Sequence, residues 1–176
     1  PISVTQMSTT LHVVPGGTVT VALARGFSRL NGIIITLFNA SISGSKAINA
    51  FHHKAGGAST LTKANDNLTL ACQIGAKRIP EYPIQSLAEH YYHLQELLNM
   101  LSGESNMNIT TRRYHSDSFI MGLTFEKLNG TGASYSGINS KDSLLTLNIG
   151  GATGATECFV TFLSHVTYNI HSGGVD

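Results

Sequence analysis

The chain has 176 residues, of which 41% are hydrophobic and 12% charged, and its formal net charge is +1 at pH 7. This apolar content can build a core and excludes a disordered chain, and the length suits one domain over residues 1–176. The charge argues against strong nucleic-acid binding, because phosphate neutralisation needs clustered cations and the densest groups are only Lys77-Arg78 and Arg112-Arg113. The longest apolar run, residues 32–38, is too short to span a bilayer, so no membrane span is expected.

The first part of the chain predicts a series of strands. Residues 18–23 alternate between Thr or Ala on one face and Val or Leu on the other, which is typical of a half-buried strand. Residues 33–38 form a continuous run of the kind buried on both faces of a sheet. Further strands are expected over residues 10–14, near 48–51 and over 68–74, with a Pro-Gly-Gly turn at 15–17.

A proline-punctuated segment follows the last of these strands. Proline disfavours helical geometry in the residue before it, so Ile79 and Tyr82 are expected to be extended. Any helix must therefore begin after this segment. The expected rigid lead-in turn consists of Pro80, Glu81, Tyr82 and Pro83.

The residues after the lead-in predict one inserted α-helix, at about residues 86–101. Ser86 is the expected N-cap, and Glu89 three residues later completes a capping box. Gly103 is the expected terminator. Apolar side chains recur at steps of three and four, which places them on one docking face. They are Leu87, Tyr91, Leu94, Leu98 and Leu101.

The C-terminal part again predicts strands, over residues 107–113, 119–125, 144–149 and 157–170. The count is about eight strands and one helix, without a βαβ rhythm. The expected fold class is therefore all-β: an antiparallel eight-stranded jelly-roll sandwich with one inserted helix.

Residue patterns that could carry catalysis are weak. His90 and His93 lie one helical turn apart and could share a metal, but an exposed helix face is the preferred interpretation. His115 and Asp117 lack the glycine-flanked serine of a hydrolase elbow. We expect no enzyme activity, no catalytic residue, no metal and no cofactor.

Two further patterns concern disulfide formation and glycosylation. Cys72 and Cys158 lie in strand-like runs, and two buried free thiols are favoured over a disulfide. Four Asn-x-Ser/Thr sequences would need a secretory route to be glycosylated, and chance explains them better in a chain rich in these residues. They begin at Asn39, Asn67, Asn108 and Asn129.

The segment 73–94 resembles viral jelly-roll capsid proteins, most closely the C-terminal jelly roll of double-jelly-roll major capsid proteins of the Polinton-like and adenovirus-like lineage. Residues 119–127, 136–146 and 172–176 support the resemblance, with weaker support from 27–30. A double jelly roll needs about two sandwiches and this length supplies one. The resemblance therefore implies either one half of a longer chain or a stand-alone single-jelly-roll subunit.

The resemblance implies a viral structural protein that self-assembles into an icosahedral shell. The expected partners are copies of the chain, with other capsid proteins as a second candidate, and nucleic acid is expected to be contacted only weakly or indirectly. The expected location is the virion capsid, after assembly in the host cell. The alternative is an oligomeric β-sandwich that binds a ligand, such as a carbohydrate-binding or tumour-necrosis-factor-like module. The absence of Trp and of clustered carboxylates counts against a lectin.

Overall fold

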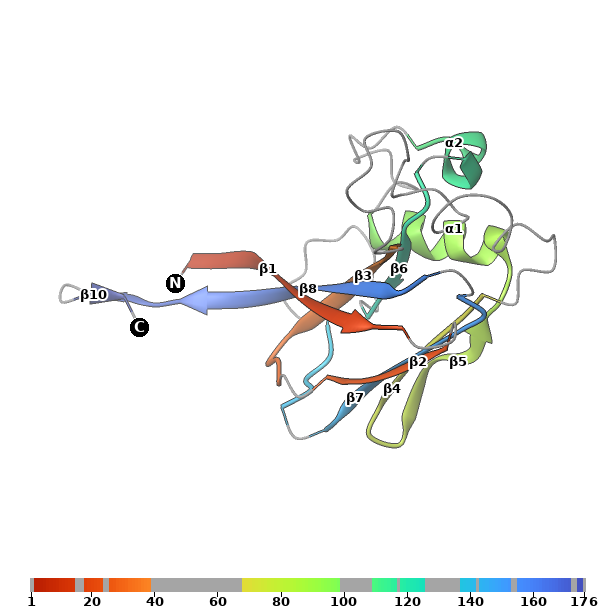
Figure 1. Cartoon of the computed structure of the whole chain (residues 1–176). Coiled ribbons are helices and arrows are strands. Elements are labelled where there is room, and N and C mark those ends of the chain that lie inside the picture. The colour runs from red at the N-terminus through yellow and green to blue at the C-terminus, as the bar shows by residue number, and fades with distance from the viewer. Residues whose placement is uncertain are drawn as a thin grey trace.

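The computed structural model describes residues 2–14, 18–23, 26–38, 68–98, 109–116, 118–125, 137–141, 143–152, 155–171 and 174–175. Most of these residues lie in two four-stranded antiparallel sheets (Figure 1). The first sheet consists, in spatial order, of β1 (Ile2–Val13), β8 (Glu157–Tyr168), β3 (Leu30–Phe38) and β6 (Met121–Thr124). The second consists of β2 (Val19–Leu23), β7 (Leu145–Gly150), β4 (Thr69–Ile74) and β5 (Lys77–Ile84).

The remaining elements are short. Helix α1 (Leu87–Leu97) connects β5 to the part of the chain that leads to β6, and α2 (Thr111–Ser116) follows it. Strands β9 (Ile170–His171) and β10 (Gly174–Val175) form a small separate ribbon near the C-terminus. No helix among the described residues is long and apolar enough to cross a membrane.

The strand pairing is that of a jelly roll. Strand β1 pairs with β8, β2 with β7, β3 with β6 and β4 with β5, all antiparallel. Such a pattern arises when one long antiparallel hairpin folds over to make two sheets. The predicted all-β, antiparallel jelly-roll sandwich is therefore confirmed.

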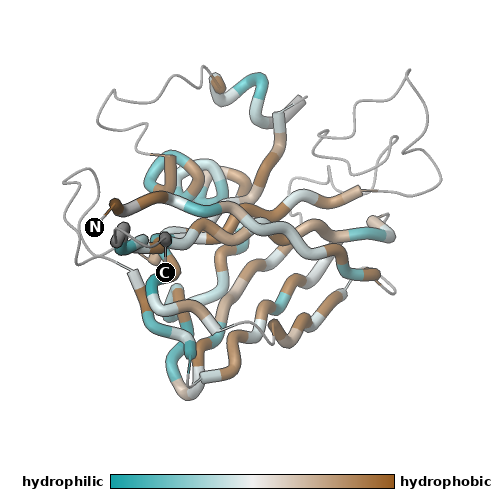
Figure 2. The backbone as a smooth tube through the Cα atoms, turned by 90° about the vertical axis from the view of Figure 1, so that its left-hand side faces the viewer, coloured by the Kyte–Doolittle hydropathy of each residue, from teal (hydrophilic) through white to brown (hydrophobic). Residues whose placement is uncertain are grey.

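The core lies between the two sheets because the strands alternate. In β2, β7 and β8 buried residues alternate with more exposed ones, so each strand contributes one side to the interior. Figure 2 shows apolar residues recurring along the strands of both layers. The interior of the first sheet includes Ile33, Ile35, Val160 and Phe162, none of which is accessible to solvent.

The structure corrects the expectation for residues 33–38. Ile33, Ile35 and Leu37 are buried as predicted, but the residues between them are only half-buried. The strand alternates because its second face is not covered along its whole length. The strand expected near 48–51 lies outside the described residues.

The strand predicted over residues 107–113 is wrong, because the described part of that segment leads into helix α2. The backbone N–H of Tyr114 donates to the Thr110 carbonyl at 2.8 Å, and the Arg113 N–H donates to the Thr110 hydroxyl at 3.3 Å. Thr110 thus satisfies N–H groups at the start of α2, which outweighs the β propensity of the threonine-rich run.

Candidate assembly surfaces

Helix α1 lies on the outer face of the first sheet, over β3 and β6 (Figure 1). Two glycines make this close approach possible. A Cβ atom added to Gly122 of β6 would lie 2.9 Å from Leu97 Cδ2 and 3.1 Å from Leu94 Cδ1. At Gly32 of β3 an added Cβ would collide with Leu97 Cδ1. The leucine side chains of the helix therefore occupy space above the sheet that is free only because these two positions have no Cβ atom.

Part of the predicted docking face of α1 packs against the core of the protein. Leu94 is buried, and Leu87, Tyr91 and Leu98 are half-buried against the core. The helix ends at Leu97 with Leu98 as its C-cap, so it is shorter than predicted. Leu101 and Gly103 lie outside the described residues. The spacing of apolar residues in the helix did not predict the contact of Leu97 with the sheet, because that contact depends on Gly32 and Gly122 in distant strands.

His90 corrects the expectation that the helix histidines line an exposed face. Its side chain is only 1% exposed. The Nε2 atom lies 3.1 Å from the Leu68 carbonyl oxygen, so Nε2 carries the proton and donates it. Among the described residues Nδ1 has no hydrogen-bond partner. Burial lowers the pKa of His90 to about 4, and His90 is therefore a neutral core residue at pH 7.

Aromatic rings also pack helix α1 against α2 and against the segment before β6. Tyr114 of α2 packs against Tyr91 with ring centroids 4.9 Å apart, and against Phe119 at 5.2 Å. Both tyrosine hydroxyls donate to backbone carbonyls: that of Tyr91 to Ile109 at 2.7 Å, and that of Tyr114 to Ile120 at 2.9 Å. Satisfied hydroxyls allow these rings to be buried, so α1, α2 and the segment before β6 form one packed unit.

The capping box predicted for α1 is present. The Glu89 N–H donates to the Ser86 hydroxyl at 3.1 Å, and the Glu89 carboxylate accepts from the backbone N–H of Ser86 at 3.2 Å and of Gln85 at 2.9 Å. These backbone hydrogen bonds lower the pKa of Glu89. The helix start is thereby fixed directly after β5.

The proline-punctuated lead-in is a strand and not the expected turn. Pro80, Glu81, Tyr82 and Pro83 lie within β5, at the edge of the second sheet, and the Ile79–Pro80 peptide bond is cis. An edge strand tolerates proline because its outward N–H groups have no strand to bond to. The Tyr82 side chain is 79% exposed, so it faces solvent at this edge.

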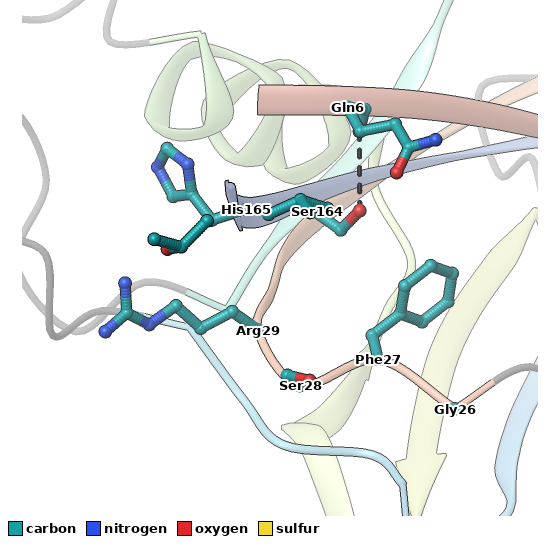
Figure 3. Close-up of a pocket in the computed structure, with 9 residues that line it drawn as sticks. Gln6, Gly26, Phe27, Ser28, Arg29, Ser164 and His165 are labelled. Carbon is teal, nitrogen blue, oxygen red and sulfur yellow. Dashed lines mark hydrogen bonds between the residues drawn. The ribbon is translucent and has the colours of Figure 1, made fainter. Parts of the chain in front are cut away.

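A polar pocket lies where β1 and β8 meet the segment before β3 (Figure 3). Its volume is about 460 Å³. Arg29 and His165 lie on the same side of it, and Ser164 donates to the Gln6 carbonyl at 3.5 Å on the other. The residue pattern of this pocket did not stand out in the sequence, because Gln6, Arg29 and His165 are far apart in the chain.

The described residues contain no group of three or more His, Cys, Asp or Glu side chains that could hold a metal. His93 Nδ1 lies 3.0 Å from the Glu96 carboxylate, on the same helix. The His115 side chain and Asp117 lie outside the described residues, as do the asparagines of the four glycosylation sequences.

The cysteines are two buried free thiols, as predicted. Cys72 lies in β4 of the second sheet and Cys158 in β8 of the first. Burial raises the pKa of each thiol to about 12. Since the thiolate is the reactive form, both side chains are inert core residues at neutral pH.

No protein-family model and no curated protein matches the sequence. Among solved structures, the major capsid protein P2 of bacteriophage PM2 is similar with a TM-score of 0.53 and 14% identity, over 98% of this chain and 47% of that chain. A quasi-atomic model of the PBCV-1 virus capsid is similar with a TM-score of 0.58 and 12% identity, over 99% of this chain and 49% of the other.

The PBCV-1 protein VP54, in a structure fitted into a reconstruction of the virophage Sputnik, gives a TM-score of 0.53 and 14% identity, over 99% of this chain and 49% of that chain. The chain thus spans about half the length of these structures. At such identities the likeness is one of fold. The chain has a jelly-roll fold like that of these viral capsid proteins.

Proposed function

We propose that the chain is a viral capsid subunit, a jelly-roll unit over residues 1–176 that self-assembles into an icosahedral shell. The proposal is supported mainly by the fold. The strands have jelly-roll order, a helix is inserted between β5 and β6, and the fold is similar to that of viral capsid proteins over 98–99% of the chain. The role is structural: the protein works by packing against neighbours.

We extend the proposal to the lineage of the chain. The similar structures are about twice as long as this chain, and the sequence resembles the C-terminal jelly roll of double-jelly-roll proteins. We therefore propose the Polinton-like and adenovirus-like group as its lineage, with the chain acting either as one jelly roll of a two-jelly-roll capsid protein or as a stand-alone single-jelly-roll subunit. Its partners are other copies and other capsid proteins of the virion, with assembly in the host cell.

The surface composition supports an assembling protein. Only 12% of the residues are charged, about half the usual share, and Ser, Thr, Asn and Gly take their place. Interfaces are depleted in charge at their centres, because each buried charge needs a partner. A net charge of +1 also leaves little repulsion between copies.

The helix α1 and its docking face have a defined part in this role. Leu94 and Leu97 cover the outer face of β3 and β6, which closes that half of the first sheet. At the other end of the sheet, Met7, Leu11 and Val13 of β1 are exposed on that face. We propose that α1 fixes the shape of the subunit and directs contacts between copies toward the uncovered half.

Sedimentation velocity of the purified chain over a concentration series tests the proposal. We expect a cooperative shift from subunits to a large species of uniform size as the concentration rises. A trimer or other small oligomer that stays constant over the series would contradict assembly into a shell and support the ligand-binding module instead.

A further inference from the structure

The two sheets have four edge strands, and β1 differs from the other three. Strand β6 has four residues and β2 has five, while β5 carries two prolines, two cationic residues and Glu81. Strand β1 has twelve residues and contains no proline, lysine, arginine, aspartate or glutamate. Natural edge strands are usually shortened, charged or interrupted by proline, which prevents other chains from pairing with them. Strand β1 has none of these protections.

The direction of the backbone groups of β1 follows from two hydrogen bonds. The N–H of Val14, the residue after β1, donates to the Thr156 carbonyl just before β8 at 2.8 Å, so it points toward β8. The N–H of His165, which stands opposite Thr5 of β1, donates to the Arg29 carbonyl at 3.0 Å and so points away from β1. In an antiparallel pair the inward and outward groups alternate residue by residue. The odd-numbered residues of β1 therefore point their N–H and C=O groups toward the open edge. No other described strand pairs with that edge.

The side chains of the same residues are exposed and mostly apolar. Met7 is 68% exposed, Leu11 is 55% exposed and Val13 is 73% exposed. Thr9, between them, bonds Thr161 of β8 through its hydroxyl at 2.9 Å. These residues lie on the outer face, since the alternate residues Ser8, Thr10 and His12 are the half-buried ones. An open row of backbone groups beside apolar side chains fits an extended strand as its partner.

The N-terminal half of β1 also projects beyond the sandwich with the end of β8 (Figure 1). Ile2 stands opposite Tyr168 and Val4 opposite Val166, and Ile2 and Val4 are 51% and 45% exposed. A two-stranded ribbon is marginal in water without a third strand or a covering surface. The projecting ribbon therefore gains from a partner along its edge.

We propose that the open edge of β1 pairs with β1 of a second copy of this chain, antiparallel about a two-fold axis, so that the two first sheets become continuous. This inference rests on the capsid function proposed above and names one of its contacts. The edge is self-complementary: with Thr9 opposite Thr9 of the second copy, each Met7 faces Leu11 across the pair. Without charged residues the two strands do not repel each other.

Leu11→Lys tests the edge, with Leu144→Lys as its matched control. Leu144 is 56% exposed, close to the 55% of Leu11, but lies outside β1. We expect Leu11→Lys to raise the dissociation constant for self-association at least about tenfold in sedimentation velocity, because it places cations along the pairing edge. Leu144→Lys should associate as the unsubstituted chain does. Both substitutions are at exposed sites, so both variants should keep the circular dichroism spectrum of the fold.

Thr9→Cys tests the register. Residues directly opposite in a hydrogen-bonded antiparallel pair have Cα atoms about 5.5 Å apart, within the range that a disulfide spans. We expect Thr9→Cys to form a dimer on a non-reducing gel after mild oxidation, while Thr20→Cys, at an exposed site of edge strand β2, stays monomeric. Cys72 and Cys158 are buried and should not contribute.

The outcomes separate this contact from the proposed function. If the unsubstituted chain assembles and Leu11→Lys assembles equally well, β1 is not the contact, although the capsid role stands. If Leu11→Lys is impaired but Thr9→Cys forms no dimer, the edge is supported and the Thr9 register is overturned. If the unsubstituted chain does not associate at all, the proposed function fails and this inference with it.

Discussion

Gly122 of β6 lies directly beneath Leu97 of α1, and a Cβ atom at Gly122 would approach Leu97 Cδ2 to 2.9 Å and the Leu94 backbone Cα to 3.4 Å. The two positions are 25 residues apart in sequence, yet a leucine at position 97 leaves room only for a glycine at position 122. Gly122→Ala should therefore push the helix off the sheet, and we expect a loss of about 1–3 kcal/mol in the free energy of unfolding, measured with urea.

Gly150→Ala is the matched control for that substitution. There an added Cβ would meet only the Thr69 hydroxyl, at 2.7 Å, so a single side chain must move and no packed helix is displaced. We expect Gly150→Ala to cost clearly less than Gly122→Ala. Equal losses at the two glycines would contradict the claim that α1 depends on the close approach at β6.

Leu94 is the most deeply buried apolar residue of α1, at 1% exposed, so docking of the helix should depend strongly on it. Leu94→Ala should lower the free energy of unfolding by about 2–5 kcal/mol, and Leu94→Asp should abolish soluble folding or assembly. Leu144→Ala, at a side chain that is 56% exposed, should change it by no more than about 0.5 kcal/mol. Normal particles from Leu94→Asp would contradict the assigned role of this face.

The buried His90 should make the fold sensitive to acid. Its pKa is about 4 in the folded protein and 6.5 in the unfolded chain, so the unfolded chain binds the extra proton between these values. Stability should therefore be complete above about pH 6.5 and decline toward pH 4, by about 3 kcal/mol in total.

Denaturant unfolding of variants between pH 4 and pH 7.5 checks this contribution. His90→Phe should be less stable at pH 7, because the Leu68 carbonyl loses its donor, but its stability should depend less on pH. An unchanged pH profile in His90→Phe would show that His90 is not the group responsible.

The two thiols offer a test of core packing. With the pKa of Cys72 and Cys158 raised to about 12 by burial, neither thiol should react with Ellman's reagent in the native protein at pH 8. Both should react after unfolding in guanidinium chloride. Rapid reaction of one thiol in the native protein would show that its sheet is more open than the structure describes.

Local signals were enough to predict several elements of the fold. The capping box at Ser86 and Glu89 and the spacing of Leu87, Tyr91 and Leu94 predicted the start and the inner face of α1. The alternation in β2 predicted which of its side chains are buried. These signals depend only on near neighbours in the chain, so the sequence contains them directly.

The errors have a common cause in contacts between distant residues. The length of β1 was underestimated because its serines and threonines lack apolar alternation, and the strand is defined by its pairing with β8. His90 is buried against residues far away in the sequence, among them Leu68, whose carbonyl bonds its ring, and Phe119. Helix α2 stands where a strand was predicted: beside the Thr110 hydrogen bonds at its start, its Tyr114 packs against the distant Tyr91 as well as against Phe119.

Electron microscopy of the assembled protein, with the particle mass measured on the same sample, tests the central claim most directly. We expect closed shells of uniform size whose density repeats the two-sheet sandwich, with β1 edges of neighbouring copies side by side. A monomer, or a small oligomer of fixed mass that never forms shells, would contradict it.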